Sequence, residues 1–394
     1  MIPLGSWADR QLTAFFTLAG RPVPSEMDGA DLMLERAAIN DFAVPGRSST
    51  GGACRLLSAR DGGWVALNLA RADDRDMLPA LFEDGALDPQ DDDAIAAHVA
   101  VCDAAVLIQR GREFGMAIAS LDERPVSPAL TVTSEGATRA MPGAHAPLVI
   151  DLSALWAGPL AAHLLWQAGA QVIKVESVGR PDAMRDGDPG LFALLNQGKA
   201  NVTLDLRDNA GRDALLALIG RADIVIEAAR PRAFRQLGLD ADALVERFPG
   251  LLWTTITGHG VAGDAANWVG FGDDCGVAGG VSAALREASG QIGFGGDAVG
   301  DPLTGLATAN AISQRWSQGR GGRLILSMSG IVAAALAEER RIDPIGLAHS
   351  LRNWAATVGQ PIASLHARGP VRTPRAPVAH RGQDNDVWLA LGQR

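Results

Sequence analysis

From residue 148 onward, short apolar runs of strand length alternate with longer stretches in which apolar residues recur at helical spacing. Nearly continuous apolar strands joined by helices are typical of a parallel sheet that is covered on both faces. The pattern therefore predicts a doubly wound, Rossmann-like α/β domain. The expected strands are 148–152, 171–176, 202–206, 224–226 and 251–256, and the expected helices between them are 158–167, 211–220 and 240–248.

Residues 1–130 have a different pattern. Helical spacing predominates in residues 1–45, and farther on two apolar runs, 54–57 and 64–69, flank the sequence Arg-Asp-Gly-Gly. Such a turn between two apolar runs predicts a β-hairpin. Helices are expected at 73–83, 93–101 and 104–114 and a strand at 115–120, so we expect a smaller α+β domain placed N-terminally.

Residues 131–146 are expected to form a linker, because Ser, Thr, Gly and Pro are frequent there. The large domain is expected to occupy residues 147–340. Within it a glycine-rich region extends to Gly300, and a helix at 302–315, a strand at 323–327 and a helix at 331–340 are expected beyond it. Residues 341–394 are expected to be a C-terminal returning segment.

Composition and charge exclude several functional classes. The chain of 394 residues has 47% hydrophobic residues and a formal charge of −10, which argues against a protein that binds nucleic acid. No apolar run reaches the roughly 18 residues of a membrane span, and no signal-peptide pattern begins the chain. We therefore expect a cytoplasmic protein. The three cysteines are far apart and neither HExxH nor CxxC occurs, so no metal site is expected.

The turn after the first strand of the large domain does not fit a dinucleotide site. Residues 153–159 contain Gly158 but lack the pattern GxGxxG, and no P-loop is present. Ligands of open α/β sheets bind at such a turn, so Trp156 and Ala157 are candidates for contact with a flat ligand group. The alternative for Trp156 is that it covers the sheet edge. Lys174 and Lys199 are the two lysines among 35 basic residues, and each is a candidate binding residue.

Several separate motifs, in order, resemble the family III CoA-transferases, which include carnitine-CoA transferases and α-methylacyl-CoA racemases. The resemblance covers about residues 147–340. It rests on the segments Pro147–Pro159, Ala168–Glu176, Leu195–Leu206, Gly211-Arg212, Ala222–Glu227, Arg230-Pro231, Leu237-Gly238 and Ile256–Gly258.

The resemblance implies a CoA-binding large domain, an interlocked homodimer, and an aspartate that forms anhydride and thioester intermediates. Asp301 matches that aspartate. Lys199 matches a lysine near the CoA phosphates, and Lys174 matches the lysine of the second strand. The substrates implied are an acyl-CoA thioester and a small carboxylic acid, with no tightly bound cofactor and no metal.

The local sequence gives Asp301 two roles. It precedes Pro302, which predicts an N-cap position with proline at the first helical residue, and an aspartate there also stabilises a helix. Gly295 and Gly296 belong to a glycine-rich segment that is expected to supply flexible backbone and N–H donors to the intermediate. His259 follows a strand end and is a further candidate for the pocket.

Departures from the family pattern leave alternatives open. Ala200 stands where the family has an arginine, and Phe271 stands at the position of the racemase histidine. The small domain also lies at the N-terminus instead of following the catalytic region. The first hypothesis is an acyl-CoA:carboxylate CoA-transferase. The alternatives are an acyl-CoA racemase or isomerase that uses Asp301 as an acid/base group, and a non-catalytic acyl-CoA-binding partner subunit.

Overall fold

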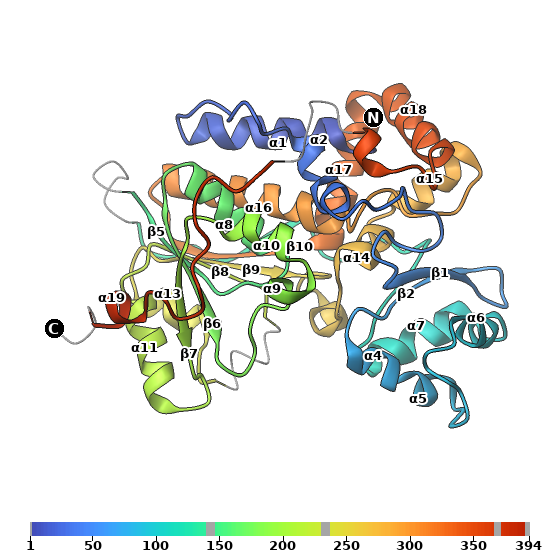
Figure 1. Cartoon of the computed structure of the whole chain (residues 1–394), viewed down its shortest axis with the longest axis horizontal. Coiled ribbons are helices and arrows are strands. Elements are labelled where there is room, and N and C mark those ends of the chain that lie inside the picture. The colour runs from blue at the N-terminus through green and yellow to red at the C-terminus, as the bar shows by residue number, and fades with distance from the viewer. Residues whose placement is uncertain (1, 139–145, 230–236, 366–371, 391–394) are drawn as a thin grey trace.

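The computed structural model describes residues 2–138, 146–229, 237–365 and 372–390. Within these ranges the chain forms one seven-stranded and one three-stranded sheet with helices around them (Figure 1). The Arg230-Pro231 motif lies outside the described residues.

The seven-stranded sheet has the order β4-β10-β9-β8-β5-β6-β7. All neighbouring pairs are parallel except β4 with β10. Because the chain runs outward from β5 in both directions, the predicted doubly wound α/β fold is confirmed. The strands are β4 (Leu130–Ser134), β5 (Leu148–Asp151), β6 (Gln171–Ser177), β7 (Ala200–Leu204), β8 (Ile224–Glu227), β9 (Leu252–Thr257) and β10 (Gly322–Ser327).

Strand β4 lies inside the expected linker, and that expectation was wrong for residues 131–134. Leu130 and Val132 alternate with threonines, but both side chains are exposed, so this strand buries no apolar face in the core. Its β-branched residues nevertheless favour extended backbone, and β10 supplies an antiparallel partner. Strand formation here depends on a tertiary contact rather than on local pattern.

The two faces of the large sheet bury separate cores. Val149 and Ile224 point to one face, and Ile150 and Val225 point to the other, as alternation along a strand requires. Helices α8 (Ala157–Gln167), α16 (Gly300–Ser317) and α17 (Met328–Ile342) cover the first face. Helices α11 (Asn209–Ile219) and α13 (Ala241–Arg247) cover the second.

The N-terminal helices pack on the large domain, so the expected domain of residues 1–130 was wrong in its first third. Side chains from residues 2–44, including Trp7, Leu12 and Phe15, are buried in the same core as α8 and α16. Figure 1 shows α1 lying beside α16. The helical pattern indicated an apolar face but not which surface would cover it. These helices are α1 (Gly5–Leu18), α2 (Gly29–Leu32) and α3 (Glu35–Ile39).

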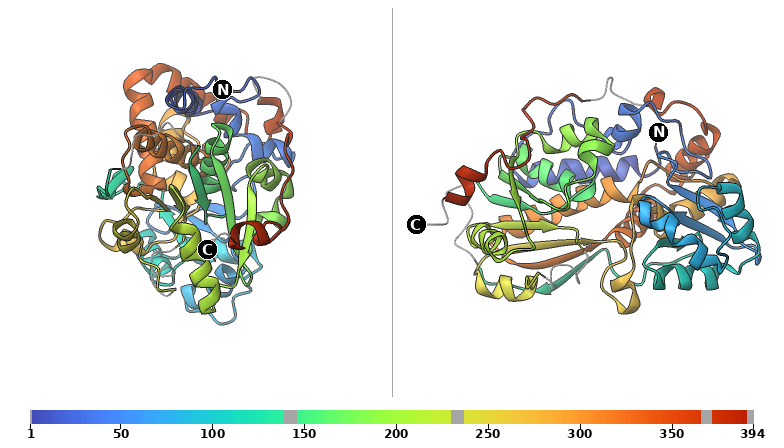
Figure 2. Two further views of the ribbon diagram at one scale, coloured as in Figure 1. Left: turned by 90° about the vertical axis from the view of Figure 1, so that its left-hand side faces the viewer. Right: turned by 60° about the horizontal axis from the view of Figure 1, so that its bottom comes forward.

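The three-stranded antiparallel sheet and four helices form the small domain, which lies to one side of the large sheet (Figure 2). The predicted hairpin is confirmed as β1 (Cys54–Ser58) and β2 (Trp64–Asn68), and β3 (Ala117–Ser120) pairs with β2. One face has its own core of small-domain side chains. The helices are α4 (Ala72–Asp76), α5 (Leu78–Phe82), α6 (Asp92–Ala100) and α7 (Ala104–Glu113).

The glycine-rich region before Gly300 contains two helices that the sequence did not predict, α14 (Gly272–Ala278) and α15 (Val281–Ser289). Helix α14 packs against β2 and β3, so it joins the small domain to the large one. The other short elements are α9 (Met184–Gly187), α10 (Pro189–Asn196), and the 3₁₀ turns η1 (Gly263–Asn267) and η2 (Ile362–Leu365).

The C-terminal segment follows α18 (Pro344–Ala356) and returns along strand β7, beside the edge of the sheet. The carbonyl of Pro377 accepts from the Gly198 N–H (2.9 Å), and Asp384 accepts from the Asn201 N–H (2.8 Å). Figure 1 shows this segment crossing the front of the sheet and ending in α19 (Asn385–Ala390). The contacts occupy backbone groups at the free edge of β7.

Both lysines of the chain are buried in ion pairs beneath the large domain's first turn. Lys199 Nζ lies 2.8 Å from Asp151 Oδ2 and also donates to the Pro159 carbonyl (3.0 Å). Lys174 Nζ pairs with Asp182 (2.8 Å) and donates to the Ser153 carbonyl. Removing one partner of such a pair leaves an uncompensated buried charge.

We expect Lys199→Ala to lower the free energy of unfolding by about 3–5 kcal/mol, because Asp151 loses its cation in the interior. Urea denaturation measures this change. The control is Arg207→Ala, since Arg207 pairs with Asp205 at the surface, where such pairs contribute about 0–1 kcal/mol. Equal effects of the two substitutions would contradict a structural role for the buried pair.

Candidate active site

Asp301 lies in the first turn of α16 and faces the beginning of α8. Helix α16 begins at Gly300, so the expected N-cap position was wrong. Pro302 is tolerated inside the first turn because the N–H groups there have no intrahelical partner. The Asp301 carboxylate accepts a hydrogen bond from the N–H of Ala157, the first residue of α8. Asp301 thus binds the start of a neighbouring helix and does not cap its own.

Both helix starts follow a non-glycine residue with positive φ. Leu155 has a φ of 67° before α8, and Ala298 has a φ of 41° before α16. Side chains rarely adopt this conformation unless the surroundings impose it. The Leu155 N–H donates to Asp182 (3.1 Å), and the Ala298 N–H donates to Asp273 (3.1 Å). These contacts fix the backbone on either side of the Asp301 carboxylate.

Helix α14 approaches the same point closely. A Cβ added at Gly272 would overlap Asp301 Oδ2 and the Ala298 carbonyl. Glycine at this position therefore lets the start of α14 touch the carboxylate of α16. Asp273 follows directly, so a second carboxyl group is brought to the site by the same turn.

Three carboxylates and one guanidinium share this site. Asp273 and Asp297 are buried, while Asp301 keeps intermediate exposure to solvent. Arg36, from α3, donates to both oxygens of Asp297, with Nε 3.0 Å from Oδ2. Its guanidinium also lies 5.7 Å from the centre of the Trp156 ring. Sequence reasoning missed Arg36, Asp273 and Asp297, since no motif distinguishes them before the chain folds.

Burial raises the pKa of Asp301 to about 7, although the charge of Arg36 and the Ala157 N–H act against this rise. The charges of Asp273 and Asp297 raise it further. Burial together with Asp297 raises the pKa of Asp273 to about 6, again against Arg36. The site therefore holds a carboxyl group that ionises near neutral pH, on a residue that is partly exposed.

Trp156 and Ala157 are brought to Asp301, as the position of their turn implies. Both are buried, and Ala157 contacts the carboxylate directly. The ammonium groups of Lys174 and Lys199 are instead occupied by hydrogen bonds and ion pairs within the protein. The three hydrogen bonds of Lys199 go to Asp151, Pro159 and Asn196. Packing around both lysines leaves no room for a water-sized molecule. Contact of these four residues with CoA stays a prediction.

Gly295 and Gly296 lie in a packed segment, not in a flexible lid as expected. Both residues are buried, and a Cβ at Gly295 would overlap Val281. The Phe294 N–H donates to the Gly46 carbonyl (2.9 Å), which ties the segment to the N-terminal part of the chain. The role of these glycines as donors to an intermediate stays a prediction.

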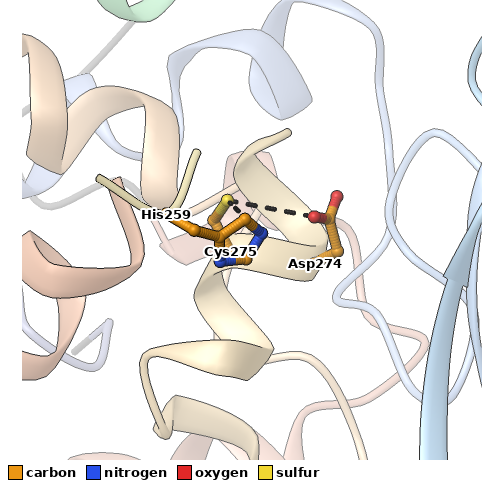
Figure 3. A group of neighbouring side chains, drawn as sticks. All are labelled: His259, Asp274 and Cys275. Atoms are coloured by element: carbon orange, nitrogen blue, oxygen red, sulfur yellow. Dashed lines mark hydrogen bonds between the residues drawn. The ribbon is translucent and has the colours of Figure 1, made fainter. Parts of the chain in front are cut away.

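His259 is buried next to Cys275 and Asp274 of α14 (Figure 3). Its Nε2 lies 3.9 Å from Cys275 Sγ, and its ring is in edge contact with Trp268. Burial and the charge of Arg112 lower the pKa of His259 to about 4, so the ring is neutral at physiological pH. A role for His259 at Asp301 stays a prediction.

No helix among the described residues is both long and apolar enough to cross a membrane. The sequence matches curated proteins over about half of its length. Acetyl-CoA:oxalate CoA-transferase of Acetobacter aceti is 29% identical over 239 residues, which is 58% of this chain and 58% of that protein. Succinyl-CoA–D-citramalate CoA-transferase of Chloroflexus aurantiacus is 32% identical over 184 residues, which is 44% of this chain and 46% of that protein.

The match thus spans about half the length of these curated relatives. Among solved structures, a hypothetical protein, Rv3272, from Mycobacterium tuberculosis is 28% identical, with a TM-score of 0.45 over 52% of this chain and 59% of that one. The model of the family described as CoA-transferase family III matches residues 147–341, which include Trp156, Lys199 and Asp301. The large domain of this chain, residues 147–341, thus matches the family III CoA-transferases.

Proposed function

We propose that the protein is an acyl-CoA:carboxylate CoA-transferase in which Asp301 is the covalent nucleophile. The observation that carries the proposal is the position of Asp301. Asp301 is a partly exposed residue at the start of α16, and its carboxylate faces both the Ala157 N–H and the charge of Arg36. Its place within the matched segment supports the same assignment.

The reaction conserves atoms and needs no redox partner. The Asp301 carboxylate attacks the thioester carbonyl and the C–S bond breaks. CoA departs as the thiolate, and the acyl group is bound to Asp301 as a mixed anhydride. The thiolate attacks the aspartyl carbonyl, which gives an aspartyl thioester and releases the first acid. The second carboxylate then attacks this thioester and forms a new anhydride. CoA thiolate finally takes the new acyl group and restores the Asp301 carboxylate.

The carboxylate cluster favours the first of these steps. Asp301 as an anion is repelled by the charges of Asp273 and Asp297, as its raised pKa reflects. Acylation removes that charge, so the repulsion disappears when the anhydride forms. Arg36 keeps enough of the carboxylate ionised to begin the attack. The Ala157 N–H then lies beside the aspartyl carbonyl and can donate to its oxygen in the tetrahedral states.

The substrates we propose are a CoA thioester and a small carboxylic acid, because the relatives are named for acetyl-CoA, succinyl-CoA, oxalate and D-citramalate. We place CoA at the carboxyl ends of the parallel strands, next to Trp156 and Ala157, with Gly295 and Gly296 toward the acyl group. No tightly bound cofactor is needed for the steps above, and we propose a homodimer in the cytoplasm.

A second candidate function is isomerisation of an acyl-CoA at its α-carbon. The pKa of about 7 for Asp301 favours it, since a general base is most effective near the working pH. In that reaction the carboxylate removes the α-proton and no aspartyl adduct forms. Deuterium lost from an α-deuterated acyl-CoA to solvent, without CoA exchange between acids, distinguishes this function from transfer.

We expect Asp301→Asn to reduce CoA transfer by roughly 10⁴-fold or more, because the amide accepts the Ala157 hydrogen bond but cannot act as the nucleophile. Exchange of CoA between succinyl-CoA or acetyl-CoA and labelled oxalate or succinate measures the rate. The control is Asp264→Asn on the exposed turn η1, which should leave the rate unchanged. Near wild-type exchange by the Asp301 variant would contradict the mechanism.

An isotope experiment tests the covalent route itself. With an acceptor acid labelled with ¹⁸O in its carboxylate, the last step leaves one labelled oxygen on the aspartate. Peptide mass spectrometry after turnover should therefore find ¹⁸O on Asp301. Turnover without label in that peptide would exclude the aspartyl anhydride.

We expect the transfer rate of the wild type to rise with pH to a plateau, with a midpoint near 7, because the carboxylate is the reactive form. Removal of the Arg36 charge raises the pKa of Asp301, so Arg36→Gln should move the midpoint upward by about one pH unit or more. The control Arg340→Gln breaks a surface pair with Glu287 and should leave the midpoint in place. A lower rate with an unmoved midpoint would assign Arg36 a purely structural role.

Light scattering at micromolar concentration tests the proposed assembly. A mass of twice that of the chain is expected for the homodimer. A monomer mass under the conditions of the activity assay would contradict it.

A further inference from the structure

The imidazole of His259, the carboxyl group of Asp274 and the thiol of Cys275 meet in the interior (Figure 3). All three residues are buried, and one ligand atom of each lies within 4.8 Å of the other two. Sγ of Cys275 is 3.9 Å from Nε2 of His259 and 3.8 Å from Oδ2 of Asp274. These are the ligand types that zinc and similar divalent ions take from proteins.

The thiol has one proton and three acceptors around it. Besides His259 and Asp274, the carbonyl of Gly258 lies 3.4 Å from Sγ. A thiol is a weak donor and can satisfy one of these groups at a time. The Gly258 carbonyl also accepts from the Ser329 N–H (3.0 Å), so the thiol proton satisfies either His259 or Asp274. One acceptor is then left in a buried place, where unpaired acceptors are costly. A cation between the three side chains would satisfy them together.

Second contacts orient the ligands toward this point. The Val269 carbonyl accepts a hydrogen bond from the His259 ring, which fixes a proton on one nitrogen and leaves the other with a free lone pair. Asn68 and the Phe271 N–H both donate to Oδ1 of Asp274, at 2.8 Å and 3.0 Å. Oδ2 is the oxygen that remains toward Cys275. Metal-binding histidines and carboxylates are commonly held by such outer hydrogen bonds.

The distances suit an ion after a small contraction. Four ligands at zinc distances, about 2.0–2.3 Å from the metal, are separated by about 3.5 Å in a tetrahedron. The separations of Cys275 Sγ from His259 Nε2 (3.9 Å) and from Asp274 Oδ2 (3.8 Å) exceed this by a few tenths of an ångström. Gly270 permits the close packing, because a Cβ there would overlap Sγ of Cys275 and lie 3.0 Å from Nε2 of His259.

The charges also balance. Burial raises the pKa of Asp274 to about 7, so binding a divalent ion displaces protons from both the Cys275 thiol and the Asp274 carboxyl group. The neutral imidazole binds unchanged. Thiolate and carboxylate together offset two positive charges, so the loaded site is neutral in the protein interior.

We propose that His259, Asp274 and Cys275 form a binding site for a zinc-like divalent transition-metal ion, with a fourth coordination position left for water or a backbone carbonyl. The ion would link the end of β9 to α14, and through Asn68 it would fasten β2 of the small domain to the same point. This inference does not depend on the proposed transferase activity. The spacing of residues 259, 274 and 275 matches no common zinc motif, which is why the sequence did not predict the site.

Cobalt(II) is the probe, because a cysteine thiolate bound to cobalt gives a near-ultraviolet charge-transfer band and tetrahedral coordination gives visible bands. Chelator-treated full-length protein is titrated with CoCl₂ under reducing conditions. We expect saturation at one equivalent, loss of the bands on addition of ZnCl₂, and a higher melting temperature with ZnCl₂.

Matched variants locate the ion. Cys275→Ser, which is nearly isosteric, should abolish the charge-transfer band and the zinc-dependent rise in melting temperature. Cys102→Ser and Cys54→Ser should retain both. Asn68→Ala should weaken cobalt binding by roughly 10- to 100-fold, as loss of an outer hydrogen bond does in other metal sites.

Two results would overturn the proposal. One is a wild-type protein that gives neither the charge-transfer band nor zinc-dependent stabilisation at a tenfold molar excess of metal. The other is a band that persists in Cys275→Ser and disappears in Cys102→Ser or Cys54→Ser. Circular dichroism of Cys275→Ser without metal establishes that the variant is folded, and native mass spectrometry of the wild type counts bound zinc independently of any variant.

Discussion

The ion pair between Arg36 and Asp297 is the contact on which the candidate active site depends. The charges of Asp273 and Asp297 raise the pKa of Asp301, and the charge of Asp297 raises the pKa of Asp273. Arg36 is the cation that opposes this effect at both Asp273 and Asp301. Two hydrogen bonds to Asp297 hold the guanidinium in place. Without this charge the three carboxyl groups would bind protons or separate, because several buried anions cannot coexist unpaired.

This ion pair joins the first 44 residues to the large domain, on which their apolar side chains already pack. Arg36 belongs to α3, and Asp297 belongs to the segment before α16, so the pair forms only when the N-terminal helices lie against α16. The small domain reaches the same region through α14, where Asn68 bonds Asp274 next to Asp273. The N-terminal helices, the small domain and the large domain therefore all reach the region of the site.

Sequence reasoning predicted the features that repeat and missed those that depend on one contact. Continuous apolar strands made the parallel sheet evident, and the Arg-Asp-Gly-Gly turn made the hairpin evident. Helix α14 was missed because Gly272 and Gly276 lower helix propensity. The glycines are nevertheless required, since added Cβ atoms would overlap Asp301 and lie 2.7 Å from Val299. The family resemblance identified Asp301 as a site residue. Nothing in the sequence distinguishes Arg36 from the other arginines, because its partner Asp297 is close to it only in the folded chain.

The two lysines stand out in the sequence, and the structure gives them a positioning role that differs from the expected direct contact with a ligand. Their retention in an arginine-rich chain suggested direct binding, but Lys174 donates to the Ser153 carbonyl and Lys199 to the Pro159 carbonyl. These carbonyls flank the turn that carries Ala157. Asp182, the partner of Lys174, also accepts from the Leu155 N–H in the same turn. Compact ammonium groups with three donors suit these narrow buried positions better than a planar guanidinium. The two lysines thus hold the turn that carries Ala157, whose N–H faces the Asp301 carboxylate.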